Sequence, residues 1–211
     1  MICSPKLAEA GIASARFDFA GSGDSTVDYI EYTPSSGMQD GLDVVAYMRG
    51  LEEIADERLG LLGWSQGGMI AMLTAARTPD VKSLVTWAGV LDMSDYAADQ
   101  YDEAKANGST QLTFDWRDPL NLSIEWFDGV RALDLKSELA NYKGALLAIN
   151  GSADTVVLPE IADEIVAAGG GDNKQKAIIE GADHTYNIFT GDMAAFDELI
   201  DATVTWFEDT L

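Results

Sequence analysis

The sequence predicts an α/β fold in which a mostly parallel sheet is covered by helices on both faces. Short apolar runs, typical of buried strands, alternate with stretches whose apolar residues recur at helical spacing. A Gly-x-Ser-x-Gly motif at residues 63–67 lies between one such run and the helix that follows it. The chain has 211 residues, enough for one domain with a sizeable core, and it contains no repeat or linker of domain size. We therefore expect a single domain over residues 1–211.

The expected elements alternate along most of the chain. A helix over residues 4–10 should end at Gly11, because glycine is the usual residue just beyond a helix C-terminus. The other expected helices cover residues 38–51, 69–76, 161–168 and the stretch from 193 onward. The expected strands cover residues 12–19, 59–62, 81–87, 145–149 and 176–179. On the last helix, one face would carry Phe196, Ile200, Val204 and Phe207.

Ser65 is the candidate nucleophile. A strand that turns into a helix within a few residues forces its pivot residue into a strained backbone conformation. Small residues two positions to either side, Gly63 and Gly67, would let the strand and the helix approach closely enough. The turn would lift the serine hydroxyl clear of the sheet and place it at a helix N-terminus. Backbone N–H groups there, including that of Gln66, can stabilise an oxyanion.

His184 is the candidate general base, and it is the only histidine in the sequence. It follows the expected strand over residues 176–179. Histidine suits this role because its pKa lies near neutral pH. The alternative is that His184 only caps a helix or packs in the core, and the serine motif upstream argues against this structural role.

Asp154 is the candidate acid that orients the histidine ring. It lies in the loop after the expected strand over residues 145–149, between Ser65 and His184 in chain order. Asp183 is the competing candidate, but a residue adjacent to the histidine in sequence rarely folds back onto its neighbour's ring. The order Ser, Asp, His is that of α/β-hydrolases and differs from the chymotrypsin and subtilisin orders.

These segments resemble the α/β-hydrolase superfamily, and more specifically the bacterial feruloyl or cinnamoyl esterase-like serine hydrolases. The resemblance rests on residues 7–13 leading into 16–25, on the serine motif, on residues 151–159 and on residues 181–184. It implies the α/β-hydrolase fold, a Ser-His-Asp triad and an acyl-enzyme intermediate.

The N-terminus departs from the pattern of that superfamily. The relatives supply a second oxyanion donor from a loop with a His-Gly signature ahead of the first helix, and this sequence begins inside or just before that helix. We therefore expect an N-terminally truncated form of the fold, or a start within a longer enzyme. Loss of one oxyanion donor typically lowers kcat by about 10²–10³.

Residues 92–142 break the alternation of strands and helices, and in the resemblance this position holds a lid or cap insertion. Its aromatic residues show no clear periodicity. They could line an apolar acyl pocket or simply pack the insertion against the body. The candidates for substrate contact are Trp116, Trp126 and Phe127 in this segment, and Trp64 beside the serine.

Composition excludes several other classes. There are 36 acidic and 13 basic residues, for a net charge of −23, which argues against nucleic acid or anionic membrane surfaces as partners. One histidine and one cysteine, Cys3, give no metal cluster and no disulfide.

The Gly21-x-Gly23 loop lacks a complete phosphate-binding motif, so we expect no cofactor. No run approaches membrane-spanning length, and the N-terminus lacks the basic and apolar regions of a signal peptide, so we expect a cytoplasmic protein. Its oligomeric state stays open.

The sequence thus predicts a serine esterase that acts on a small-molecule carboxylic ester, with aryl-acyl or cinnamoyl esters as candidates. Thioesterase, lipase-like and peptidase activities stay open, because the serine motif does not encode the leaving group. The alternative from another class is a non-catalytic or impaired hydrolase-fold remnant that lacks part of the oxyanion hole.

Overall fold

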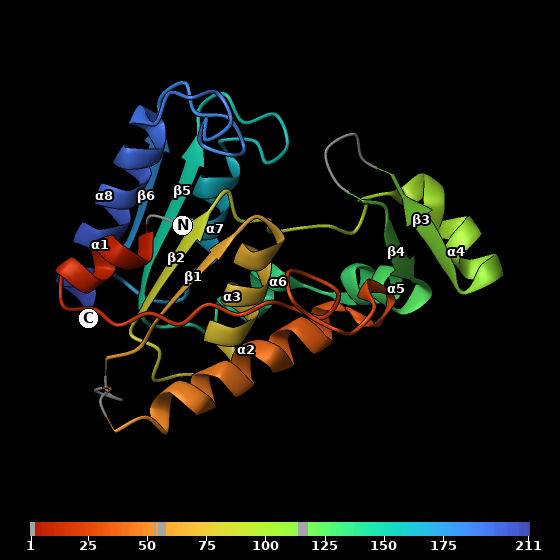
Figure 1. Ribbon diagram of the computed structural model, residues 1–211, viewed down its shortest axis with the longest axis horizontal. Helices are drawn as coiled ribbons and strands as arrows, with labels where there is room; N and C mark the ends of the chain where they lie inside the picture. The colour runs from red at the N-terminus through yellow and green to blue at the C-terminus, as the bar shows by residue number, and fades with distance from the viewer. Residues whose placement is uncertain (1–2, 53, 55–57, 114–117) are drawn as a thin grey trace. The chain divides into compact units, whose positions relative to one another are not determined.

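The computed structural model of the chain describes residues 3–52, 54, 58–113 and 118–211. The chain divides into two compact units, and each is formed by segments far apart in the sequence (Figure 1). Unit 1 comprises residues 1–15, 45–91 and 135–211, and unit 2 comprises residues 16–44 and 92–134.

Unit 1 contains a four-stranded parallel sheet in the order β1-β2-β5-β6 (Figure 1). The strands are β1 (Gly60–Trp64), β2 (Ser83–Trp87), β5 (Ala145–Gly151) and β6 (Lys174–Ile179). Every residue of β5 is buried, as expected for an interior strand covered on both faces. In the register, Trp64 pairs with Trp87 and Trp87 pairs with Ile149. The carboxyl ends of β1, β2 and β5 therefore lie along one edge, where α/β folds place their sites.

Helices cover both faces of this sheet (Figure 1). The helices α3 (Gln66–Ala76), α6 (Leu135–Leu139) and α7 (Ile161–Ala168) pack against one another on one face, and α8 (Ala194–Thr210) packs with α1 (Cys3–Glu9) on the other. α8 buries Leu199, Ile200, Trp206 and Phe207, whereas Phe196 and Val204 of the predicted face are only partly buried. Gly11, at φ 77°, ends α1 as predicted.

Unit 2 combines two segments that the sequence analysis did not bring together. Residues 16–44 contribute η1 (Tyr29–Glu31) and the first part of α2 (Pro34–Arg49). Residues 92–134 contribute η2 (Ala98–Gln100), α4 (Tyr101–Asn107), α5 (Ile124–Ala132) and an antiparallel pair, β3 (Ser109–Leu112) with β4 (Leu120–Ser123). η1 contacts β4, and the buried cluster of this unit comprises Tyr32, Ala104, Leu112, Leu122, Trp126, Phe127 and Val130.

The predicted lid range does not coincide with a unit boundary. Residues 92–134 belong to unit 2, but residues 135–142 belong to unit 1, where α6 contacts α3 and α7. The Tyr142 hydroxyl donates a hydrogen bond to the carbonyl oxygen of Ala145 at the start of β5. A lid role for the insertion stays a prediction.

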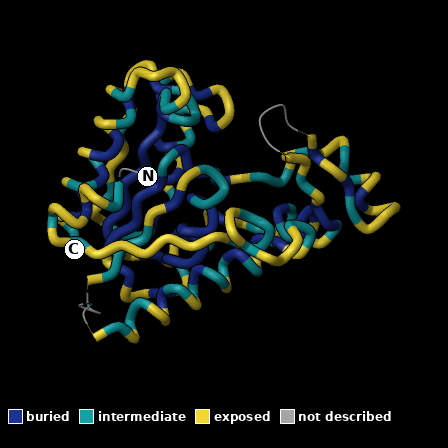
Figure 2. The backbone as a smooth tube through the Cα atoms, viewed as in Figure 1, coloured by how far each residue is buried: buried dark blue, intermediate teal, exposed yellow. Residues whose placement is uncertain are grey.

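The predicted strand over residues 12–19 is wrong. This segment forms no strand, and residues 13–18 are exposed (Figure 2). Within the described part of the chain, β1 lies at the edge of the sheet and pairs only with β2. A segment without a ladder partner leaves its N–H and C=O groups to water, which local strand propensity cannot offset.

No helix in the described ranges is both long enough and apolar enough to cross a membrane.

The interior of β5 provides a test of the packing. Leu146 is fully buried, and we expect Leu146→Ala to lower the free energy of unfolding by about 2–5 kcal/mol, since it removes buried methyl groups and leaves a cavity. Urea denaturation followed by circular dichroism measures the change. The matched control is Leu158→Ala, because the Leu158 side chain is 48% exposed and should lose less than about 1 kcal/mol. Equal losses in the two variants would contradict this assignment of the core.

Candidate active site

Ser65 occupies the junction between β1 and α3. Its backbone has φ 55° and ψ −122°, a conformation that costs a non-glycine residue about 1–3 kcal/mol. The Ser65 carbonyl accepts hydrogen bonds from the N–H groups of Gly68 at 2.9 Å and Met69 at 3.3 Å, so the first turn of α3 starts from this residue. The serine side chain therefore lies at the positive end of a helix.

Two glycines allow the strand and the helix to approach this closely. A Cβ atom on Gly63 would lie 2.1 Å from the carbonyl oxygen of Gly67, and one on Gly68 would lie 2.8 Å from the Cα of Gly89. A Cβ atom on Gly67 would meet nothing within 4 Å. The expectation that Gly67 must be small for packing is therefore wrong. The second close contact falls on Gly68.

The structure places the imidazole of His184 between Ser65 and Asp154. Nε2 lies 3.0 Å from the Ser65 Oγ, and Nδ1 lies 2.8 Å from the Asp154 Oδ2. Because an ionised carboxylate only accepts hydrogen bonds, we assign the ring proton to Nδ1. Nε2 is then the acceptor for the serine hydroxyl, which is the protonation state that a general base requires. The His184 side chain is 17% exposed and the Asp154 side chain is fully buried.

The Asp154 carboxylate is fixed by its own loop. Its Oδ1 accepts hydrogen bonds from the N–H groups of Val156 at 2.8 Å and Val157 at 2.9 Å, which leaves Oδ2 directed at His184. This loop is also joined to the loop that carries His184, residues 180–193 between β6 and α8, which we call the histidine loop. The Ala153 N–H donates to the Ala182 carbonyl at 2.9 Å, and a Cβ atom on Gly151 would lie 2.1 Å from the same oxygen.

Asp183, the competing candidate for the acid, is used within the histidine loop. Its Oδ1 accepts hydrogen bonds from the N–H and hydroxyl of Thr185, both at 2.8 Å, and from the N–H of Asn187 at 3.0 Å. Burial alone would raise the pKa of the Asp183 carboxyl. The hydrogen bonds from Asn187 and Thr185, together with the neighbouring His184, outweigh burial and hold that pKa below its ordinary value of 3.8.

The remaining predicted site residues fall into two groups. Gln66 is the first residue of α3, directly after the serine, and Trp64 is 44% exposed at the end of β1. Trp126 and Phe127 lie in the core of unit 2, 1% and 0% exposed, with their rings packed edge to face. This burial favours the packing role that the sequence analysis left open for both residues. Trp116 lies outside the described residues.

Sequence reasoning missed three contributions to this site. Gly68 and Gly151 are required by close approach of the backbone, and the buried Tyr186 anchors the histidine loop through its hydroxyl, which donates to the Ile149 carbonyl at 2.8 Å. The glycines could have been noticed from their places beside the serine motif and at the end of an apolar run. The contact of Tyr186 joins residues 37 positions apart, and no local signal indicates it.

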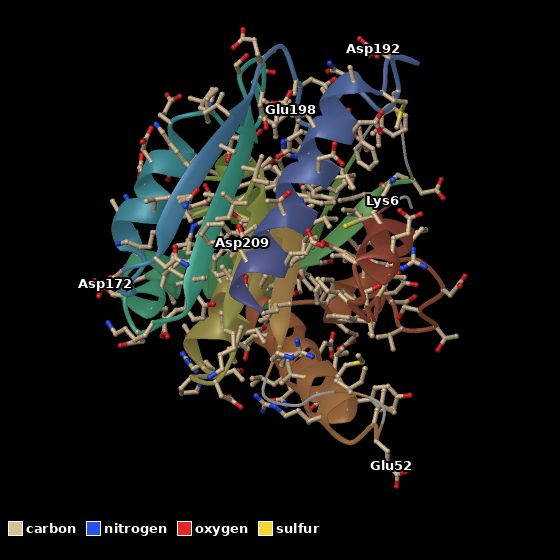
Figure 3. All side chains as sticks on the ribbon, turned by 90° about the vertical axis from the view of Figure 1, so that its left-hand side faces the viewer. Lys6, Glu52, Asp172, Asp192, Glu198 and Asp209 are labelled. Carbon is tan, nitrogen blue, oxygen red and sulfur yellow. The ribbon has the colours of Figure 1, made fainter. Side chains whose placement is uncertain are left out.

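Several acidic side chains lie on the outside of unit 1. Asp172, Asp192, Glu198 and Asp209 are exposed and are labelled in Figure 3. In the part of the chain that the structure describes, no three His, Cys, Asp or Glu side chains are grouped closely enough to hold a metal ion.

Comparison with known proteins agrees with the fold. The sequence pattern of the prolyl oligopeptidase family of peptidases matches residues 4–211. The 2,6-dihydropseudooxynicotine hydrolase of Paenarthrobacter nicotinovorans is 33% identical over 91 residues, which are 40% of this chain and 23% of that protein. The chain thus spans about a quarter of that relative's length.

Solved structures match over nearly the whole chain. The monoacylglycerol lipase of Paleococcus ferrophilus has a TM-score of 0.77 at 18% identity, with 98% of this chain and 87% of that chain covered. Est1E of Butyrivibrio proteoclasticus, with ferulic acid bound, has a TM-score of 0.74 at 20% identity, with 98% and 79% covered. These matches establish the α/β-hydrolase fold.

The two glycines of the serine motif provide a matched pair of variants. Gly63→Ala should lower the free energy of unfolding by about 3 kcal/mol or more, because its Cβ would meet a backbone oxygen that cannot move aside. Gly67→Ala should be neutral or raise stability by up to about 1 kcal/mol, because its Cβ is unobstructed within a helix. Urea denaturation measures both. A stable Gly63→Ala protein would be inconsistent with the packing described here.

The lowered pKa of Asp183 predicts a pH-dependent contribution to stability. A carboxyl whose pKa is lower in the folded state stabilises the fold above its ordinary pKa of 3.8, and the contribution is lost as the pH falls through the folded-state pKa. At pH 7, Asp183→Asn should cost about 0.5–1 kcal/mol after solvent screening. Below about pH 4 the difference from wild type should shrink.

Urea midpoints measured at pH 7 and at pH 3.5 test this expectation. The control is Asp172→Asn, because Asp172 is exposed and has no hydrogen bond among the described residues. Its small difference from wild type should not follow the same course with pH. A cost for Asp183→Asn that grows toward low pH would have the wrong sign for the proposed role of the carboxylate.

Proposed function

Because the chain belongs to the prolyl oligopeptidase family, we propose that it is a serine hydrolase that cleaves carboxylic esters through a Ser65-His184-Asp154 triad. The observation that supports this most directly is the continuous hydrogen-bonded line from the Ser65 Oγ to the His184 Nε2, and from the His184 Nδ1 to the buried Asp154 carboxylate. The order of the three residues along the chain is the α/β-hydrolase order.

In the acylation step, the His184 Nε2 takes the proton from the Ser65 hydroxyl as the serine oxygen attacks the ester carbonyl carbon. Asp154 holds the ring in the reactive tautomer and stabilises the imidazolium that forms. The Gln66 N–H, at the start of α3, is our candidate for one oxyanion donor. When the tetrahedral intermediate collapses, the bond to the alcohol oxygen breaks and His184 returns the proton to the departing alcohol.

In the deacylation step, a water molecule replaces the alcohol. His184 removes a proton from this water as its oxygen attacks the acyl carbon, and the bond between that carbon and the Ser65 Oγ then breaks. The serine regains its proton from His184 and the carboxylic acid leaves. Both steps use the same three side chains and no cofactor.

For the substrate, we propose a small-molecule ester with a medium-sized acyl or aryl-acyl group, including cinnamoyl esters. The similarity of the fold to Est1E, whose structure holds ferulic acid, motivates the aryl-acyl class. The family match favours a second candidate, a short peptide, because the amide carbonyl can be attacked by the same triad. A panel of aryl esters, alkyl esters, thioesters and peptide amides distinguishes these classes.

Covalent labelling of the full 211-residue chain tests the proposal first. A fluorophosphonate probe followed by intact mass should add one adduct to the wild type, and none to Ser65→Ala or to His184→Ala, since each variant removes the nucleophile or its base. With the best ester of the panel, Asp154→Asn should lower kcat by about 10⁴, because the amide favours the wrong ring tautomer.

Circular dichroism and a thermal melt establish that each variant is folded. A folded wild type that takes no adduct and hydrolyses no substrate of the panel would overturn the proposal and favour the alternative of a hydrolase-fold protein without catalysis. An adduct that persists in Ser65→Ala would show that the reactive group lies elsewhere.

A further inference from the structure

We propose that Trp64 is a positioning residue that fixes the backbone and ring of His184 relative to the nucleophile. The proposal rests on the proposed function, because it assigns a role within the Ser65-His184-Asp154 arrangement. It differs from the substrate contact suggested by the sequence, in which Trp64 would act on the acyl group itself.

Trp64 is the last residue of β1 and directly precedes Ser65. Successive side chains of a strand point to opposite faces, so the indole lies on the face opposite to Gly63. The indole N–H donates a hydrogen bond of 3.0 Å to the carbonyl oxygen of His184, 120 residues further along the chain. One side chain thus links the residue beside the nucleophile to the backbone of the base.

This bond holds the backbone of His184, which the hydrogen bonds of the neighbouring residues in the histidine loop do not reach. The Asp183 carboxylate binds Thr185 and Asn187, and the Tyr186 hydroxyl binds β5. Among the residues that the structure describes, the Trp64 indole is the one donor bonded to the carbonyl of His184 itself. The other contacts therefore hold the residues that flank His184, whereas Trp64 holds the backbone of His184 itself.

The two rings are also in contact. The centroids of the Trp64 and His184 rings are 5.6 Å apart, with 37° between the ring planes. The imidazole is held at its two nitrogens by Ser65 and Asp154, and the indole lies against its ring. Contact with the indole restricts rotation of the imidazole out of that line. A misplacement of about 1 Å can cost roughly 10²-fold in rate, so such restriction has catalytic consequences.

Trp64→Phe separates the two roles. It keeps an aromatic ring but removes the N–H donor. We expect the rate of fluorophosphonate labelling, and kcat for the best ester, to fall by about 10-fold, with KM changed less than about 2-fold. Labelling needs the serine and its base but few substrate contacts. A higher KM with an unchanged labelling rate would show a substrate-binding wall and overturn the proposal, as would no change in either quantity.

Trp87→Phe is the matched control. Trp87 pairs with Trp64 in the register of the sheet, and its indole N–H donates to the Thr203 hydroxyl of α8 at 2.9 Å. Its ring lies edge-on to the ring of Tyr186, a contact that the phenyl ring of Trp87→Phe can keep. It should lose a similar hydrogen bond and similar stability while keeping the labelling rate of the wild type. If Trp87→Phe loses labelling to the same degree as Trp64→Phe, the effect is one of general stability and the proposal fails.

Nuclear magnetic resonance of ¹⁵N-histidine-labelled protein tests the positioning role without any reaction. The chain has a single histidine, so its imidazole signals need no assignment. We expect the Nδ1 proton signal to be sharp in wild type and in Trp87→Phe, and broadened by exchange with water in Trp64→Phe. A sharp signal in Trp64→Phe would overturn the proposal. This readout stays decisive even where the labelling experiment disproves the proposed esterase function.

Discussion

The backbone of Ser65 is the constraint on which the rest of the site depends. A strand must become a helix across one residue, and that residue sits at φ 55°, outside the conformations that side chains normally allow. The strain is held by contacts on both sides: Gly63 lies against the carbonyl of Gly67, and Gly68 against Gly89. Because the buried helix and strand fix both ends of the turn, the hydroxyl cannot relax away, and the proposed base, His184, must be brought to it.

His184 is brought there by two loops that are joined to each other. The acid loop leaves β5 and the histidine loop leaves β6, and these strands are neighbours in the sheet. The Ala153 N–H binds the Ala182 carbonyl, and Gly151 has no side chain at the point where the loops meet. This contact ties the loop of Asp154 to the loop of His184 close to both side chains. The strained serine thus faces a ring whose loop is tied to the loop of the aspartate.

Much of the site was predictable because its chemistry restricts both residue type and chain order. A single histidine, a serine in its motif and an aspartate after a buried strand left few alternatives, and the structure brings these three together. The strand expected over residues 12–19 failed because a strand needs a partner, which local pattern cannot supply. The bond from Trp64 to His184 spans 120 residues, and the core of unit 2 joins two distant segments of the chain. Contacts between such distant residues produce no periodic pattern in the sequence, so the sequence alone does not predict them.

The division of the chain also bears on how it folds. Unit 2 cannot complete its core until residues 92–134 have been synthesised, although residues 16–44 emerge much earlier. Unit 1 in turn needs β5, β6 and α8, all of which follow residue 134. Contacts between these segments therefore close long loops, and topologies rich in such contacts fold slowly and expose apolar surface while they do. A high negative charge opposes association between such partly folded chains, so the acidic surface can act before the proposed active site has formed.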